Sequence, residues 1–372
     1  MIYLDCAATT LQKPPAVVRA AAWAVGRLAT PGRGGHPAAA QAAALAFRCR
    51  EEAAALFGVA DPERVIFTAN ATHALNIAIR SLVPPGGRVV LSGWEHNAVT
   101  RPLAALDAKV RIAATPLFRP QAALDAFRAA VEPGVDAVIC THVSNVFGYT
   151  LPVADIAALC RQRGVPLIVD AAQSAGCLPL DLDGWGAAFI AMPGHKGLYG
   201  PQGTGLLLCG RQVRTAPLLY GGTGSASASP EMPPFLPDRL EAGTHNMPGI
   251  AGLLQGLRFV RCMGTGRILA HEQRLTAQAA GGLKRLSGVR VFSGPAQTGV
   301  LSFQIAGVDC EEAAARLGQM GIAVRAGLHC APMAHESGGT FEEGTVRASF
   351  SAFNTQGEAA RLVRCVARLT GR

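Results

Sequence analysis

Short apolar runs alternate with Ala- and Leu-rich helical patterns through the middle of the chain. The runs are rich in Val, Ile and Leu and are bounded by Gly, Pro or polar residues, which is typical of buried β-strands. Because helical segments separate most of them, the pattern predicts βαβ units that build a mostly parallel seven-stranded sheet covered on both faces. The predicted strands lie at residues 64–69, 88–93, 110–115, 137–142, 166–172, 187–194 and 203–210.

The pattern changes beyond the last of these runs. Residues 220–237 are rich in Gly, Ser and Pro and predict a long irregular segment at the end of the sheet domain. A helical region near 247–286 follows, and a smaller α+β lobe is predicted from strands at 300–307, 322–327 and 345–350 and helices near 310–320 and 355–369. We therefore expect an N-terminal segment, 1–25, that packs with the small lobe, a large domain over 26–262 and a small C-terminal domain over 263–372.

Composition narrows the class of protein. The chain has 372 residues, 49% of them hydrophobic and 16% charged, which excludes a disordered or fibrous protein. Lys and Arg number 34 against 25 Asp and Glu, giving a net charge of +9. The Arg residues are nevertheless dispersed, with no basic block and no interleaved aromatic residues. We therefore expect no nucleic-acid partner.

The spacing of the cysteines and the length of the apolar runs indicate the cellular compartment of the protein. The 10 cysteines never form a C-x-x-C pair and mostly lie inside apolar runs, which favours reduced, buried thiols over a disulfide or zinc framework. The N-terminal residues lack the cationic start and apolar core of a signal peptide, and no apolar run reaches the roughly 18 residues of a membrane span. We expect a soluble, cytoplasmic protein with neither a metal site nor a membrane partner.

Polar side chains follow several predicted strands directly. The carboxyl ends of parallel strands meet at one edge of a sheet, where loop backbones and helix N-termini present their donors. These side chains should therefore converge on one site although well over a hundred residues separate them. They are Thr72, His96, Asn145, Asp170, Gln173, His195 and Lys196.

Lys196 and Asp170 are the sharpest chemical candidates. Lys196 follows an apolar strand in a chain with only four lysines, and a Schiff base to an aldehyde cofactor is one use for a buried lysine. Asp170 ends another strand, where a carboxylate beside a pyridinium nitrogen would keep that nitrogen protonated and make the ring an electron sink. The alternatives are a solvated loop lysine and a helix N-cap.

A series of motifs runs from Leu4 to about residue 365. In order they are YLDCAATT, ANATHALN, EHNAV, HVSNVFG, VDAAQS, GHKGLYGPQGTG, EAGTHN, RAGLHCAP and RASFSAFNT. This ordered set resembles the class V aminotransferase family of pyridoxal 5′-phosphate (PLP) enzymes, specifically its cysteine desulfurase and selenocysteine lyase branch. The resemblance implies the PLP-dependent transferase fold type I, with a large PLP-binding domain and a smaller C-terminal lobe.

The resemblance also implies roles for individual residues. Lys196 resembles the Schiff-base lysine, Asp170 the pyridinium partner, and His96 the imidazole that stacks on the cofactor ring and relays protons. Taken singly, such histidines and amides could equally be structural. The remaining implied contacts are Thr72 and His195 with the phosphate, Asn145 and Gln173 with the cofactor and substrate, Gln173 near the phenolic oxygen, and Thr244 with the phosphate of the neighbouring subunit of a homodimer.

Two residues near Lys196 depart from the family pattern. Pro193 stands where the family often has a serine, and proline supplies neither a hydroxyl nor an N–H to the phosphate. Gly197 is an additional residue before LYGP. Both features resemble a less characterised subgroup of desulfurase-like proteins.

The surroundings of Cys330 help to decide which reaction of this family the chain is expected to catalyse. Nine of the ten thiols can be explained as small buried hydrophobes, but Cys330 lies in a loop bounded by Gly and Pro, next to His329 and near Arg325. Such surroundings can hold a partly deprotonated thiol suited to nucleophilic attack, and the loop resembles that of the desulfurase nucleophile. Arg347 resembles the guanidinium that binds the substrate α-carboxylate, with Arg325 and Asn145 beside it.

These observations lead to one expected function and to alternatives. We expect a PLP-dependent cysteine desulfurase that converts L-cysteine to L-alanine and carries the sulfur as a persulfide on Cys330 for transfer, with a sulfur-acceptor protein as a candidate partner. The alternatives are a selenocysteine lyase, with selenocysteine as substrate, and another class V enzyme such as a transaminase, racemase or β-lyase. A basic scaffold protein without a cofactor is the non-enzymatic alternative.

Overall fold

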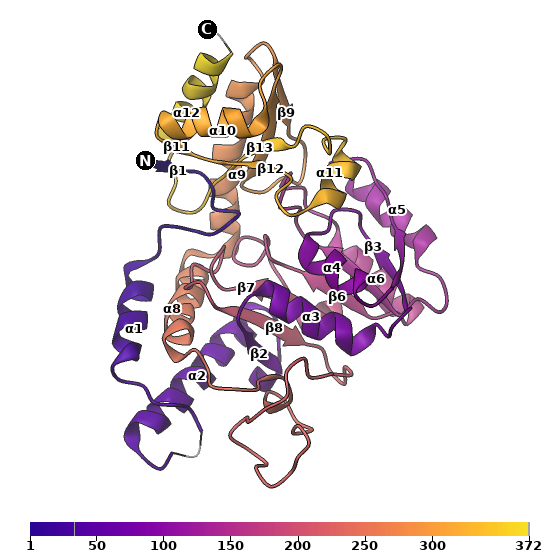
Figure 1. Ribbon diagram of the computed structural model, residues 1–372, viewed down its shortest axis with the longest axis vertical. Coiled ribbons are helices and arrows are strands. Elements are labelled where there is room, and N and C mark those ends of the chain that lie inside the picture. The colour runs from indigo at the N-terminus through magenta and orange to yellow at the C-terminus, as the bar shows by residue number, and fades with distance from the viewer. Residues whose placement is uncertain (33, 371–372) are drawn as a thin grey trace.

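The chain forms a large domain built on one sheet and a smaller lobe that carries both termini (Figure 1). The computed structural model describes residues 1–32 and 34–370. The sheet of the large domain has seven strands in the order β2-β8-β7-β6-β5-β3-β4, and only β8 runs antiparallel to its neighbours. Its strands are β2 (Val65–Thr68), β3 (Arg88–Leu91), β4 (Lys109–Ile112), β5 (Ala137–Thr141), β6 (Leu167–Asp170), β7 (Phe189–Pro193) and β8 (Gly205–Cys209). The predicted sheet is confirmed.

Side chains of these strands alternate between two apolar layers, one on each face of the sheet. Val90 and Val138 belong to one core cluster, whereas Leu91 and Ile139 belong to the other. Such alternation follows from the two-residue period of a strand, and it explains why the runs are apolar throughout. The helices of the large domain are α1 (Pro15–Val25), α2 (Pro37–Leu56), α3 (Ala71–Leu82), α4 (Asn97–Ala104), α5 (Pro120–Ala130), α6 (Val153–Arg163), α7 (Leu182–Trp185) and α8 (Met247–Met263), with short 3-10 turns η1 (Pro62–Arg64) and η2 (Asp238–Leu240).

The small lobe packs helices on a four-stranded antiparallel sheet. The strand order is β12-β13-β10-β9, and a separate two-stranded sheet pairs β1 with β11. One predicted strand, 322–327, is therefore two strands that join different sheets. The elements are β1 (Ile2–Tyr3), α9 (Thr265–Leu283), β9 (Val289–Phe292), β10 (Val300–Ile305), α10 (Cys310–Gln319), β11 (Ile322–Ala323), β12 (Arg325–Gly327), α11 (Pro332–Gly338), β13 (Thr345–Ser349) and α12 (Gln356–Leu369).

The N-terminal residues connect the two parts of the molecule. β1 pairs in parallel with β11 of the small lobe, whereas α1 lies along α8 (Figure 1). The division into segments 1–25, 26–262 and 263–372 thus stays an interpretation, since the first of these contacts both parts. Residues 220–237 form an irregular excursion apart from a few turns, as expected. Among the described helices, none is both long and apolar enough to cross a membrane.

Candidate active site

One cavity at the carboxyl ends of the parallel strands gathers residues from five separate segments. Its polar lining includes all seven side chains that the sequence places after strands: Thr72, His96, Asn145, Asp170, Gln173, His195 and Lys196. Pro193 and the start of α3 complete one wall. The expected convergence on one site is therefore present, and the roles of the individual residues stay proposals.

Lys196 and Asp170 lie close enough to influence each other's charge. Burial lowers the pKa of Lys196 to about 8, against the opposing attraction of Asp170. Burial raises the pKa of Asp170, which receives one hydrogen bond of 2.9 Å from the N–H of Ala172 and attraction from Lys196. A carboxyl group so buried ionises fully only when a cation stands opposite it, and a protonated ring nitrogen in the cavity would be such a cation.

His96 forms the N-cap of α4 and lines the cavity. Its Nδ1 accepts a hydrogen bond of 3.0 Å from the N–H of Ala98, so the neutral ring carries its proton on Nε2. Burial lowers the pKa of His96 to about 4, with repulsion from Lys196 next in size, so the ring is neutral near pH 7. The preceding carboxylate, Glu95, is fully buried and accepts hydrogen bonds from Ser92 and Gly93, which fixes the loop that carries His96.

The start of α3 supplies a site suited to an anion. Asn70 caps this helix by accepting a hydrogen bond from His73, and helix geometry leaves the N–H groups of Ala71 and Thr72 without intrahelical acceptors. His195 lines the same cavity and has its Nδ1 3.0 Å from the hydroxyl of Thr9. Unpaired N–H groups at a helix N-terminus attract phosphate, so this end of the cavity fits the phosphate of a cofactor.

The additional residue Gly197 is accommodated by a close backbone approach. A Cβ on Gly197 would lie 2.3 Å from the carbonyl oxygen of Ala175, and a Cβ on Gly176 would lie 2.0 Å from the carbonyl oxygen of Gly197. Gly176 also has a φ of +98°, which side chains disfavour. The loop after Lys196 can therefore lie directly on the turn after Gln173 only because both positions are glycine.

The N-terminal segment lies against this site. Gln173 donates a hydrogen bond of 2.9 Å to the carbonyl of Ala7, and the hydroxyl of Thr10 donates one of 3.0 Å to the carbonyl of His195. The amine of Lys13 donates a further bond of 2.9 Å to the same carbonyl. The backbone next to Lys196 is thus held by residues near the start of the chain.

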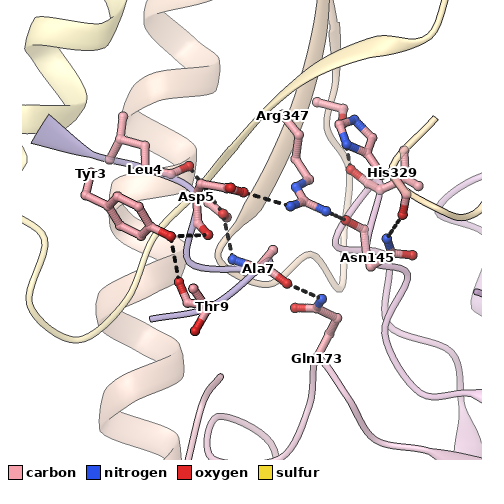
Figure 2. A network of polar contacts seen from close by, with 12 residues as sticks. Tyr3, Leu4, Asp5, Ala7, Thr9, Asn145, Gln173, His329 and Arg347 are labelled. Atoms are coloured by element: carbon pink, nitrogen blue, oxygen red, sulfur yellow. Dashed lines mark hydrogen bonds and ion pairs between the residues drawn. The ribbon is translucent and has the colours of Figure 1, made fainter. Parts of the chain in front are cut away.

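Cys330 sits in a loop of the small lobe that docks on the large domain. Asn97 donates its backbone N–H to the carbonyl of Cys330 at 2.8 Å, and the side chain of Asn145 donates to the carbonyl of His329 at 2.9 Å (Figure 2). Both loop residues have positive φ, 50° at His329 and 55° at Cys330. The thiol of Cys330 is exposed, whereas the ring of His329 is buried and has its Nε2 at 3.1 Å from the hydroxyl of Thr345.

The burial of His329 changes the role that the sequence predicts for this residue beside Cys330. Burial lowers the pKa of His329 well below its ordinary value, so its imidazole is neutral and supplies no positive charge beside Cys330.

The two exposed thiols are Cys330 and Cys262, which corrects the explanation of nine thiols as buried: Cys262 lies near the exposed end of α8.

Arg347 is buried next to the site with a carboxylate partner that the sequence analysis assigned no role. Its Nη2 lies 2.9 Å from Oδ1 of Asp5, and its Nη1 donates a hydrogen bond of 2.9 Å to the carbonyl of Asn145 (Figure 2). Arg325 is exposed and faces Arg347 across the β12–β13 ladder. Asp5 lies within the motif YLDCAATT, but its contact with Arg347 spans 342 residues and has no local signal.

Two further residues line other cavities. Thr244 is exposed and lines a separate pocket with His73 and Gly203, and its contact with another subunit stays a prediction. Glu272 lines a second cavity that Lys196 also lines, together with Cys6 and Cys177, and burial raises the pKa of its carboxyl group to about 8. Sequence reasoning missed Glu272, because an acidic residue within a polar helical pattern gives no sign of burial.

Comparisons with known proteins identify the family to which this chain belongs. Residues 2–362 match the family model described as aminotransferase class-V. A probable cysteine desulfurase of Vibrio cholerae is 32% identical over 98% of this chain and 93% of its own length. One of Mycolicibacterium paratuberculosis is 33% identical over 99% of this chain, which spans only 55% of that protein. The apo structure of a cysteine desulfurase from Thermococcus onnurineus NA1 superimposes with a TM-score of 0.91, at 29% identity, over 100% of this chain and 94% of that one. The chain therefore belongs to the class V aminotransferase family and, within it, to the cysteine desulfurases.

Proposed function

We propose that this chain is a PLP-dependent cysteine desulfurase, which converts L-cysteine to L-alanine and carries the sulfur as a persulfide on Cys330. The observation that carries the proposal is the docking of the Cys330 loop on Asn97 and Asn145, beside the cavity that holds Lys196. An exposed thiol fixed at the rim of a cavity with a buried lysine is the arrangement that sulfur abstraction from a bound amino acid requires.

The residues present fit PLP. Lys196 would hold the cofactor covalently, Asp170 its ring nitrogen and His96 its ring face, with Gln173 near the phenolic oxygen and Asn145 beside it. Thr72 and His195 would bind the phosphate at the start of α3, with Thr244 of a second subunit. Pro193 lines this wall and offers no donor, so the helix N–H groups carry more of the phosphate binding.

The side chains of the site divide the reaction between them. When bound, PLP supplies an electron sink that stabilises negative charge at the substrate Cα. Lys196, with a pKa lowered to about 8, is suited to remove the proton from Cα near neutral pH. The neutral ring of His96 offers its Nε2–H as a hydrogen-bond donor to the bound groups, and Arg347 with Arg325 binds the substrate carboxylate.

Cys330 performs the sulfur transfer. Its Sγ, as a thiolate, attacks the sulfur of the bound cysteine, so that an S–S bond forms while the substrate C–S bond breaks. The electron pair of the C–S bond stays with the three-carbon fragment, which takes up a proton and leaves as alanine. The exposure of Cys330 supports onward transfer of the persulfide sulfur to an acceptor protein or a thiol.

The same proposal includes a homodimer in the cytoplasm. Leu219 and, within the irregular excursion, Tyr220 and Phe235 are exposed, and Leu219 lines the same pocket as Thr244. Large apolar side chains exposed together are typical of an interface. Free cysteines throughout the chain fit a reducing compartment.

The direct test is incubation of the PLP-loaded protein with L-cysteine while alanine and sulfide are measured together, in the presence of a thiol reductant. We expect alanine and sulfide in equal amounts. Formation of pyruvate and ammonia, of D-cysteine, or of a keto acid with no alanine would favour a β-lyase, a racemase or a transaminase instead.

A further inference from the structure

Asp5, in the N-terminal segment, lies against Arg347, the arginine proposed above to bind the substrate carboxylate. Its backbone is fixed on the neighbouring strand, because the N–H of Ser349 donates to the carbonyl of Leu4 at 2.7 Å and the N–H of Ala7 donates to the hydroxyl of Ser349 at 2.8 Å. The hydroxyl of Tyr3 lies 3.2 Å from the carbonyl of Asp5 (Figure 2). The carboxylate of Asp5 therefore reaches Arg347 from a rigid support.

Two of the three guanidinium nitrogens of Arg347 are held by the protein. Asp5 takes an N–H of Nη2 and the carbonyl of Asn145 takes an N–H of Nη1, which fixes both the plane and the rotation of the group. Arg347 is only 2% exposed, so water does not compete for these two hydrogen bonds. Its Nε is buried and has no partner within the described residues. A guanidinium has five N–H donors, so one on each nitrogen is left for a ligand.

The charges favour a ligand with a carboxylate. Arg347 and Arg325 bring two positive charges to neighbouring strands, and Asp5 neutralises one of them. One carboxylate therefore completes the balance of charge at this place. An Arg347 without Asp5 would keep its charge but would be free to turn toward other acceptors, so that fewer of its donors would meet the ligand at the same time.

We infer that Asp5 is a positioning residue that orients Arg347 for the α-carboxylate of the amino-acid substrate. The inference rests on the proposed function, in which Arg347 binds that carboxylate. If the inference holds, loss of Asp5 weakens the binding of ligands that carry a carboxylate and leaves the binding of amines without a carboxylate unchanged.

The test compares two ligands that differ only in the carboxylate. L-alanine and ethylamine are titrated into the PLP-loaded wild type, Asp5→Ala and Asp5→Asn, and dissociation constants are read from the cofactor absorbance. We expect Asp5→Ala to weaken L-alanine binding about tenfold, which corresponds to one hydrogen bond to a charged group, and to leave ethylamine binding unchanged. Asp5→Asn keeps an oxygen acceptor for Nη2 and should restore most of the loss. In turnover of L-cysteine, KM should rise in Asp5→Ala while kcat changes little.

Asp183→Ala is the matched control. Asp183 pairs with Arg64 at 2.6 Å and has 23% of its side chain exposed, close to the 21% of Asp5, but its partner is not the arginine proposed to bind the carboxylate. It should leave the binding of both ligands unchanged. Equal weakening of L-alanine and ethylamine in Asp5→Ala, unchanged binding, or tighter binding of L-alanine would overturn the inference. Absence of alanine production from L-cysteine by the wild type would instead overturn the proposed desulfurase activity, since the comparison of L-alanine with ethylamine needs no sulfur chemistry.

Discussion

The backbone carbonyl of Cys330 accepts a hydrogen bond of 2.8 Å from the N–H of Asn97 at the first residue of α4. His96, the N-cap of the same helix, lines the Lys196 cavity. A thiol of the small lobe and an imidazole of the large domain are thus attached to one helix terminus. Any movement of the Cys330 loop away from the cavity must break this bond, together with the bond from Asn145 to His329.

Covalent attachment of the cofactor should occur at Lys196. Its pKa is lowered to about 8, so the amine becomes neutral and able to react at lower pH than an ordinary lysine. The rate of PLP attachment to the cofactor-free protein should therefore rise with pH and level off above about 8. Borohydride reduction followed by peptide mapping should place the label on Lys196, and Lys196→Ala should abolish it.

Lys13 provides the control for this prediction. Burial also lowers the pKa of Lys13 to about 8, and its amine contacts the carbonyl of His195. Lys13→Arg should keep the label on Lys196. Label on Lys13, Lys109 or Lys284 in the wild type would show that the active site has been placed wrongly.

Asp170→Ala should weaken PLP binding and reduce turnover by about a hundredfold or more, because it removes the buried carboxyl group that we propose as the partner of the cofactor ring nitrogen. Equilibrium binding of PLP and alanine production from L-cysteine measure the two effects. Asp155→Ala, an exposed change in the helix before β6, is the control and should alter neither. Activity of Asp170→Ala equal to that of the wild type would exclude the assigned role.

The site could be predicted from sequence where its residues follow strands. Asp170 and Lys196 come directly after apolar runs, and the edge of a parallel sheet brings such positions together whatever their separation. The boundaries of the strands in the small lobe were harder to predict from the sequence. Residues 322–327 predict a single strand, but the chain changes sheet at Val324, and that change depends on pairing with β1 and β13.

Contacts between distant segments account for what sequence reasoning missed. β9 is half exposed and pairs only along one side, so its pattern is weak, and the short α11 lies in a loop-like stretch. Asp5 and Glu272 are ordinary acidic residues in the sequence, and only the packing of the folded chain buries Glu272 or places Asp5 against Arg347. The sequence also did not show that His329 is neutral, because its pKa is lowered mainly by burial in the folded chain and not by its neighbours in the sequence.

Glu272 should make the stability of the protein depend on pH. Its folded pKa of about 8 lies above the ordinary value of 4.5, so between these values the folded state keeps a proton that the unfolded state has lost. The free energy of unfolding should therefore fall as pH rises through this range, by at most about 1.4 kcal/mol per pH unit from this group. Glu272→Gln should remove that part of the slope in denaturant unfolding.

The control for the pH dependence is Glu343→Gln, which changes an exposed carboxyl group of the small lobe. It should preserve the slope of the wild type. An identical slope in wild type and Glu272→Gln would show that Glu272 is ionised in the folded protein.

The most direct test of sulfur transfer is mass spectrometry of peptides from Cys330→Ala, Cys262→Ala and wild type after treatment with L-cysteine, combined with the rate of alanine release. Cys262 is the other exposed thiol, so its variant is the matched control. Wild type and Cys262→Ala should carry one extra sulfur on the peptide containing Cys330, removable by a thiol reductant, and should release alanine. Cys330→Ala should still bind PLP and L-cysteine but fail to release alanine, whereas a selenocysteine lyase would keep substantial deselenation. Undiminished alanine release by Cys330→Ala, or added sulfur only on another cysteine, would contradict a persulfide on Cys330.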